Sequence, residues 1–338
     1  MRVKGKNLNQ LMLVAILIGI SAIFSALSPS FLTTVNVMNT IRQVAMISIV
    51  ASAATLVMIA RGLDISVGGT LALTGVIYAS LATKGVPLSL ALLVACLAGT
   101  MVGVINGALT VGLKINPVIA TLGTMYATRG LAFLYSGGVA VVNGLPANFS
   151  NLGRGYIGPF PTPIIIMLIV FLIFHFLLNN TLLGKYTYAV GGNPETAILS
   201  GIPVAMVTFI LYTLVGLMTG LSGAIMASRL GSGQPNIGMG FEFDIILAVL
   251  LGGTSLAGGE GTVLGTLIAT VIVGVLANGL NLLGVHTFYQ YIIKGVVLVA
   301  AVVIDMQLKG QGVIRVGKMV PAGKFKLEGG EALKEKNR

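Results

Sequence analysis

Residues that commonly carry chemistry are scarce in this chain of 338 residues, which has one cysteine and two histidines. The lone Cys96 excludes an intrachain disulfide and a cysteine-based metal site or redox pair. His175 and His286 are far apart in the sequence, and each lies near the end of an apolar segment, which argues against a metal centre. We therefore expect this chain to bind neither a metal nor a cofactor of its own.

Acidic residues are also few, with nine in the whole chain. Six of them precede the C-terminal tail: Asp64, Glu195, Glu242, Asp244, Glu260 and Asp305. The carboxylate chain expected of a proton-coupled pump is missing. So are a nucleophile elbow, a His-Glu zinc pattern and the phosphate-binding Gly-x-x-x-x-Gly-Lys-Ser/Thr motif. We therefore expect a chain that catalyses no reaction and does not bind ATP through that motif.

Apolar residues are what the chain has in abundance. Hydrophobic residues make up 56% and charged residues 9%, and the mean hydropathy is +0.99. This balance excludes a soluble domain, and apolar runs of about 18 residues or more recur, each long enough to cross a bilayer. We predict an all-α, polytopic membrane bundle of about ten segments, with a range of eight to ten. The segments cover residues 8–27, 44–60, 67–82, 88–113, 118–135, 163–180, 202–227, 244–257, 262–283 and 287–305.

Glycine shapes the expected packing, since the chain has 46 of these residues. Gly99, Gly103 and Gly107 recur at four-residue spacing, which puts three small residues on one helix face and allows close approach of another helix.

The positive net charge of +11 follows the predicted topology and does not indicate a nucleic-acid partner. Eight of the 20 basic residues lie after Met306, and Arg2, Lys4 and Lys6 precede the first apolar run. Cytoplasmic ends carry such an excess of lysine and arginine. We therefore predict a transmembrane domain over 1–305, a basic cytoplasmic tail over 306–338, and both termini in the cytoplasm.

A polar island at 191–203 separates two long apolar segments. Asn193 is a good N-cap, Pro194 suits the first helical position and Glu195 favours a helix N-terminus. Gly201 can take the left-handed position that ends a helix. The pattern predicts a capped helix of about two turns near 193–201 on the cytoplasmic side. A docking element for another protein and a well-capped connecting loop both remain possible at this point.

Polar residues inside the apolar segments are candidates for the pathway. Asn106-Gly107, Gly112 and Gly123 recur with the same spacing as Asn278-Gly279, Gly284 and Gly295, which is typical of repeated halves with a pathway between them. Chance matching in a glycine-rich chain is the alternative. Asp64 is expected to pair with Arg61 and clamp a turn, with a role in transport as the alternative, and Arg129 lies deeper. The candidates for pathway or gate are Arg61, Asp64, Asn106, Thr121, Arg129 and Asn278.

Four ordered motifs give the chain a family resemblance. It resembles the membrane permease subunits of bacterial ATP-binding-cassette importers for monosaccharides, the ribose-type permeases, over about residues 10–305. One departure is Thr196, where the family usually has alanine, and the tail after Lys309 is longer than expected. The motifs are 61–68 (Arg-Gly-Leu-Asp-Ile-Ser-Val-Gly), 121–131 (Thr-Leu-Gly-Thr with Arg-Gly-Leu), 191–201 (Gly-Gly-Asn-Pro-Glu-Thr-Ala-Ile-Leu-Ser-Gly) and 251–261 (Leu-Gly-Gly-Thr-Ser-Leu-Ala-Gly-Gly-Glu-Gly).

The resemblance implies partners and roles. Two permease copies, as a homodimer, would form the pathway in the bacterial cytoplasmic membrane, and separate ATPase subunits that use ATP and Mg²⁺ would dock on the capped helix. A periplasmic or lipid-anchored sugar-binding protein would face the loops at 136–162 and 228–244. The residues implied in ATPase coupling are Asn193, Pro194, Glu195, Thr196, Ala197, Leu199, Ser200 and Gly201.

Two alternatives remain open. A permease of the same superfamily for branched-chain amino acids or nucleosides would share these motifs. A secondary transporter that works alone would need an ion gradient and no ATPase, and the scarcity of membrane carboxylates argues against it.

Overall fold

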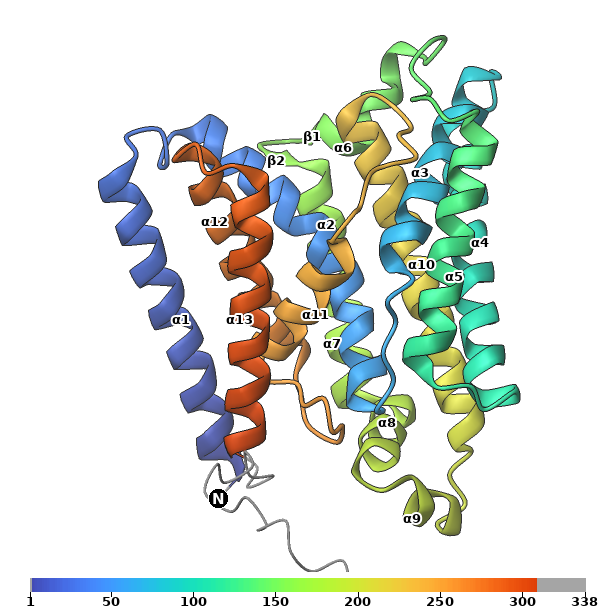
Figure 1. The fold of residues 1–338 in the computed structure, drawn as a ribbon, viewed down its shortest axis with the longest axis vertical. Helices are drawn as coiled ribbons and strands as arrows, with labels where there is room; N and C mark the ends of the chain where they lie inside the picture. Colours follow the sequence, from blue (N-terminus) through green and yellow to red (C-terminus); the bar gives the residue numbers. More distant parts are fainter. Residues whose placement is uncertain (1, 309–338) are drawn as a thin grey trace, which may run out of the picture.

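The computed structural model describes residues 2–308, and these are helical almost throughout (Figure 1). A short hairpin pairs Tyr156 with Pro161 and Ile157 with Phe160. The helices and strands are α1 (Arg2–Leu27), α2 (Thr34–Ile59), α3 (Val67–Thr83), α4 (Leu88–Gly107), a π-helix (Ala108–Gly112), α5 (Pro117–Ser136), a 3₁₀ turn (Ala147–Ser150), α6 (Asn151–Arg154), β1 (Tyr156–Ile157), β2 (Phe160–Pro161), α7 (Thr162–Asn180), α8 (Leu182–Gly192), α9 (Pro194–Leu199), α10 (Val204–Leu230), α11 (Phe241–Leu251), α12 (Val263–Leu282) and α13 (Thr287–Leu308).

The helices confirm a polytopic membrane bundle. Six of the described helices are long and apolar enough to cross a membrane, and two apolar ones, over 67–83 and 287–300, are shorter. The span predicted at 244–257 is wrong, because α11 has only 11 residues. At about 1.5 Å per residue it rises about 16 Å, roughly half of the hydrocarbon thickness. Helix α11 therefore does not cross the bilayer by itself.

Helix α2 is longer than the sequence suggested. The second span was predicted over residues 44–60, but Thr34–Ile59 is one continuous helix that also takes in the more polar residues 34–43. Its N-cap is Thr33, whose side chain accepts a hydrogen bond from the Asn36 N–H. No glycine or proline interrupts the segment, so nothing in it breaks the helix. The polar stretch therefore forms the first turns of a spanning helix.

The core of the bundle lies where α2 and α10 meet. In α2, 83% of the spanning window is buried inside the protein. The expectation of close packing along Gly99 and Gly103 is confirmed, because a Cβ at Gly99 would lie 2.4 Å from the Gly216 carbonyl oxygen of α10. A Cβ at Gly103 would likewise lie 2.4 Å from the Tyr212 carbonyl oxygen of the same helix. Small residues let these backbones approach each other in lipid.

The two ends of the bundle differ in structure. Figure 1 shows α9 at the same end as the N-terminal end of α1, whereas α6 and the β1–β2 hairpin lie at the opposite end. This arrangement agrees with the predicted inner and outer sides, and the orientation in the membrane stays a prediction. Residues 309–338 of the predicted basic tail lie outside the described residues, and the division at 305 also stays a prediction.

Candidate functional site

Helix α9 has the caps that its sequence predicts. The Asn193 Oδ1 accepts the Thr196 N–H at 3.1 Å, and Pro194 occupies the first turn. Gly201 has φ of +78°, and the Ile202 N–H returns to the Ala197 carbonyl at 3.0 Å. These contacts satisfy backbone groups that a short helix leaves free at its ends. The helix is therefore fixed by its own sequence, although it is only six residues long.

The side chains of α9 divide into an inward and an outward set. Ala197 is 3% exposed and faces the bundle, so its side chain supports the helix from within. Leu199 is 88% exposed and Ile198 61% exposed. Glu195 and Thr196 are also exposed. An exposed apolar pair beside a carboxylate and a hydroxyl is a surface that suits a protein partner.

Arg61 joins α9 to the membrane helices. Its Nε donates to the Gly191 carbonyl and its Nη2 to the Gly192 carbonyl, both at 2.7 Å. These carbonyls end α8, where the helix dipole is negative and backbone acceptors are unpaired. Arg61 itself follows the last turn of α2 with φ of +66°. One guanidinium group thus holds α8, and through it α9, against the end of α2.

The glycine-rich connection between α11 and α12 completes this junction. The Gly259 N–H donates to the Ile59 carbonyl at 2.8 Å. A Cβ at Gly191 would lie 1.7 Å from the same Ile59 oxygen, so only glycine fits there. Tyr188 of α8 donates its hydroxyl to the Gly261 carbonyl at 2.7 Å. Burial raises the pKa of Tyr188 above its ordinary value, and the phenol therefore stays protonated and keeps donating.

A buried polar network lies deeper in the bundle, along the extended segment between α2 and α3. The Asp64 Oδ1 accepts the Ser66 N–H at 2.9 Å and the Ser66 hydroxyl at 2.6 Å. The Asn106 Nδ2 donates to both Asp64 oxygens, at 3.3 and 3.2 Å, and to the Ser66 Oγ at 2.8 Å. Thr124 donates to the Asn106 Oδ1 at 2.7 Å. We call Asp64, Ser66, Asn106 and Thr124 the interior network.

The backbone of the same segment is held from two further helices. The Ile65 N–H donates to the Thr121 Oγ1 of α5 at 3.1 Å. The Leu63 carbonyl accepts the Tyr212 hydroxyl of α10 at 3.2 Å. The segment 61–66 is thereby connected to α4, α5 and α10. Such buried polar contacts have a high cost when one partner is removed.

The expected pair between Asp64 and Arg61 is not the one that forms. The guanidinium of Arg61 extends to the end of α8, while Asp64 is 7% exposed and bonds to Ser66 and Asn106. The left-handed turn at Arg61 directs the two side chains to different places. Asp64, Asn106 and Thr121 are thus brought together along one segment, and Arg61 lies apart from them at the α8 junction.

Arg129 and Asn278 belong to other contacts. Arg129 of α5 donates to the carbonyls of Pro235 and Ile237, which lie in the connection before α11. Asn278 of α12 exchanges two hydrogen bonds with Asn36 of α2, at 2.8 and 2.9 Å. The first contact fixes the connection between α10 and α11 against α5, and the second joins two spanning helices.

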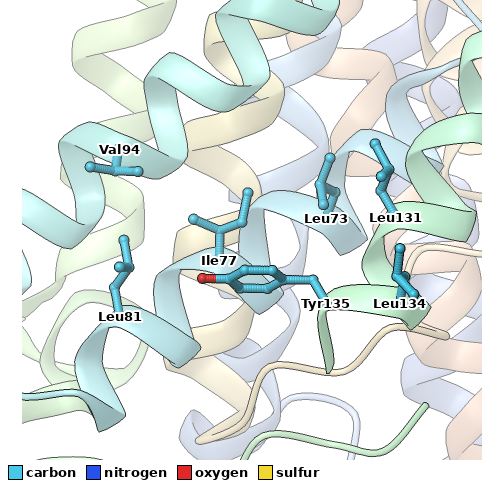
Figure 2. A pocket seen from close by; sticks show the side chains of 7 residues that line it. All are labelled: Leu73, Ile77, Leu81, Val94, Leu131, Leu134 and Tyr135. Carbon is cyan, nitrogen blue, oxygen red and sulfur yellow. The ribbon is translucent and has the colours of Figure 1, made fainter. Parts of the chain in front are cut away.

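A hollow of about 410 Å³ lies between α3, α4 and α5 (Figure 2). Its lining is aliphatic except for Tyr135. A polar solute needs several hydrogen-bond partners to replace water, so this hollow does not suit one. Among residues 2–308, no group of three or more histidine, cysteine, aspartate or glutamate side chains is placed to hold a metal ion.

Sequence reasoning missed several members of these contacts. Helix α8 was not predicted, although Thr181 is a good N-cap and accepts the Gly184 N–H. Tyr188 and Tyr212 were not selected, because the direction of a tyrosine hydroxyl follows from packing. Ser66 lies inside a motif that was noticed, and a serine two residues after an aspartate is a usable signal of a side chain–backbone turn.

Comparison with known proteins gives one family. The family profile described as branched-chain amino acid transport system / permease component matches residues 36–302. No solved structure matches the chain.

Curated relatives match over most of the chain. The ribose import permease protein RbsC of Bacillus subtilis (strain 168) is 46% identical over 285 residues, which cover 84% of this chain and 88% of that protein. RbsC of Escherichia coli (strain K12) is 44% identical over 305 residues, covering 89% and 95%. The L-arabinose ABC transporter permease protein AraH of Azospirillum brasilense is 37% identical over 304 residues, covering 90% and 89%.

Proposed function

The chain belongs to this family of transport-system permease components, and we propose that it forms the transmembrane pathway for a ribose-like monosaccharide in an ATP-binding-cassette importer. Members of the family are multi-pass membrane subunits of bacterial transporters and are not the catalytic ATPase. Nucleotide chemistry therefore belongs to another subunit.

The substrate proposal is supported by the relatives. Proteins named as ribose import permeases match at 41–46% identity, and those named for L-arabinose and D-allose match at 37% and 38%. The family description names branched-chain amino acids, which makes a permease for such amino acids the second candidate. Competition for uptake of radiolabelled ribose by leucine, arabinose or allose separates these substrates.

The partners follow from the same proposal. An ATPase subunit that binds ATP and Mg²⁺ docks on the exposed face of α9, through Glu195, Thr196 and Leu199. A periplasmic or lipid-anchored sugar-binding protein delivers the sugar to the opposite end. A second copy of this chain completes the pathway.

The connection from α9 to the interior carries the proposal. Helices α8 and α9 meet at Asn193, Arg61 holds the end of α8, and Asp64 follows Arg61 by three residues. A displacement of α9 by the ATPase therefore moves the segment 61–66 through backbone and charge-assisted bonds. That segment is bonded to α4, α5 and α10, so its movement changes how these helices pack.

Co-purification in mild detergent tests the docking step. The wild-type chain should retain its ATPase, and Glu195→Arg should lose it by about tenfold or more, because charge reversal places a cation at a helix N-terminus. Lys185→Met is the control, since it removes an exposed charge from α8, leaves the docking face of α9 intact and should leave association unchanged. Retention of the ATPase by the Glu195→Arg chain at the wild-type level would remove α9 as the docking element.

A further inference from the structure

Three arginines meet at the end of the bundle that carries α6, which is the outer end in the predicted orientation. They are Arg42 of α2, Arg154 of α6 and Arg229 of α10, and we call them the outer arginine cluster. The Arg42 Nη2 donates to the Arg154 carbonyl at 3.3 Å, and the Arg154 Nε donates to the Arg229 carbonyl. The Arg42 Nη1 also donates to the Asn39 Oδ1 at 3.4 Å, whereas the exposed Arg154 keeps the N–H groups of its two terminal nitrogens available.

The cluster has no carboxylate partner among the described side chains. The charged groups that act on Arg229 are Arg42 and Arg154, which have the same sign. The buried Arg42 Nε makes no hydrogen bond to any described residue. Its guanidinium is held instead over the Tyr156 ring, 5.0 Å from the centroid. Like charges this close repel each other, so an anion from outside would stabilise the cluster.

The described carboxylates lie elsewhere in the structure. Asp64 belongs to the interior network, and Asp244 pairs with Lys294 at 2.7 Å. Glu195 lies in the first turn of α9, which is at the end of the bundle opposite α6 (Figure 1). Glu242 lies in α11 and acts on Arg129, and Glu260 lies in the connection between α11 and α12. In the part of the chain that the structure describes, none of these carboxylates forms an ion pair with the three arginines.

The support beneath the cluster is rigid. The Gly153 N–H donates to the Ser228 Oγ at 2.8 Å, and the Ser228 hydroxyl donates to the Phe149 carbonyl at 2.6 Å. A Cβ at Gly153 would lie 2.2 Å from the backbone nitrogen of Arg229, so α6 packs directly on the end of α10. Three cations are therefore presented in a fixed arrangement, which lowers the entropy lost when a partner binds.

The position of the cluster favours a soluble partner over lipid. Arg42 and Arg229 extend from the two helices at the core of the bundle, and α2 is the most buried spanning helix described. Lipid headgroups surround the rim of a membrane protein, whereas this cluster lies on the end above its core. Guanidinium groups bind carboxylates through paired N–H donors, and a charged patch accelerates the encounter with an oppositely charged protein.

We propose that the outer arginine cluster is the docking contact for an acidic patch on the extracytoplasmic sugar-binding protein. The proposal rests on the importer function above and adds the residues and the chemistry of the contact. Arg154, which is exposed, meets the partner first, and Arg42 and Arg229 lie beneath it.

Binding of the purified sugar-binding protein to the permease–ATPase complex in phosphatidylcholine nanodiscs tests this contact. Arg154→Gln should raise Kd about tenfold and weaken its dependence on salt, because one desolvated charge pair is lost. Arg154→Lys should recover part of the affinity. Lys84→Gln removes an outer cation that lies over Tyr135 instead, and it should bind within about twofold of wild type.

Equal affinity of the wild-type, Arg154→Gln and Arg229→Gln complexes would overturn the proposal. A second result would also overturn it: phosphatidylglycerol co-purifies with the wild-type chain and is lost from the arginine variants, while their affinity for the binding protein is unchanged. That result would assign the arginines to lipid. ATP hydrolysis by the same complex, measured without the binding protein, reports ATPase docking on α9. Absence of ATP hydrolysis in the wild-type complex contradicts the proposed function. Normal ATP hydrolysis in the arginine variants, together with unchanged affinity for the binding protein, contradicts the docking contact alone.

Discussion

Arg61→Met tests whether motion passes from α9 to the interior through one side chain. The substitution keeps much of the side-chain length and removes both 2.7 Å bonds to the carbonyls of Gly191 and Gly192. A hydrogen bond to a charged group contributes about 1.5–3 kcal/mol, and exposure of Arg61 reduces this, so we expect about 2–3 kcal/mol for the pair. The equilibrium constant between α8 bound to the end of α2 and α8 released from it then shifts by a factor of about 30–150 towards release.

The assay measures sugar uptake and ATP hydrolysis together, in proteoliposomes that contain the permease, the ATPase and the binding protein. Arg61→Met should still hydrolyse ATP, because the docking face of α9 is intact, but the sugar moved per ATP should fall about tenfold or more. Lys185→Met, a change to another exposed cation on α8, should leave that ratio unchanged. A wild-type ratio in Arg61→Met would refute the mechanical link.

Two further substitutions address the packing that supports the site. Gly191→Ala places a methyl group 1.7 Å from the Ile59 oxygen and should abolish the monodisperse peak of the protein in size-exclusion chromatography. Gly192→Ala is the control, because a Cβ there meets nothing within 4 Å, and it should elute as wild type. Equal elution of the two variants would contradict the close packing at this junction. Asn106→Leu removes the amide donor from the buried Asp64 carboxylate and should lower stability by about 2 kcal/mol. Thermal unfolding in detergent checks this, and an unchanged Tm would remove Asn106 from the supports of that carboxylate.

Local signals predicted local structure well. The caps of α9 depend on Asn193, Pro194 and Gly201, and each residue acts on backbone groups within a few positions of itself. The apolar runs likewise predicted most spanning helices, since length and hydropathy decide whether a helix can cross a bilayer. The glycines of α4 predicted a close helix contact, although the partner helix α10 became known only from the fold.

Contacts between distant segments could not be predicted in this way. Arg61 and Asp64 are three residues apart, and opposite charge made a local pair the simplest interpretation. The left-handed backbone at Arg61 and the free carbonyls at the end of α8 decide otherwise. Helix α11 shows the same limit. Its apolar run has the composition of a span, but the helix ends at Leu251. A Cβ at the next residue, Gly252, would lie 2.5 Å from the backbone nitrogen of Thr266, which shows how closely the chain packs on α12 at this point.

The central claim is that an ATPase docked on α9 drives a sugar through this chain. The most direct measurement is uptake of radiolabelled ribose into proteoliposomes that contain the permease, its ATPase and its sugar-binding protein, with ATP or a non-hydrolysable analogue enclosed. We expect uptake with ATP, none with the analogue, and none when the ATPase is omitted. Uptake that follows an imposed ion gradient in vesicles containing the permease alone would contradict the account and identify a secondary transporter.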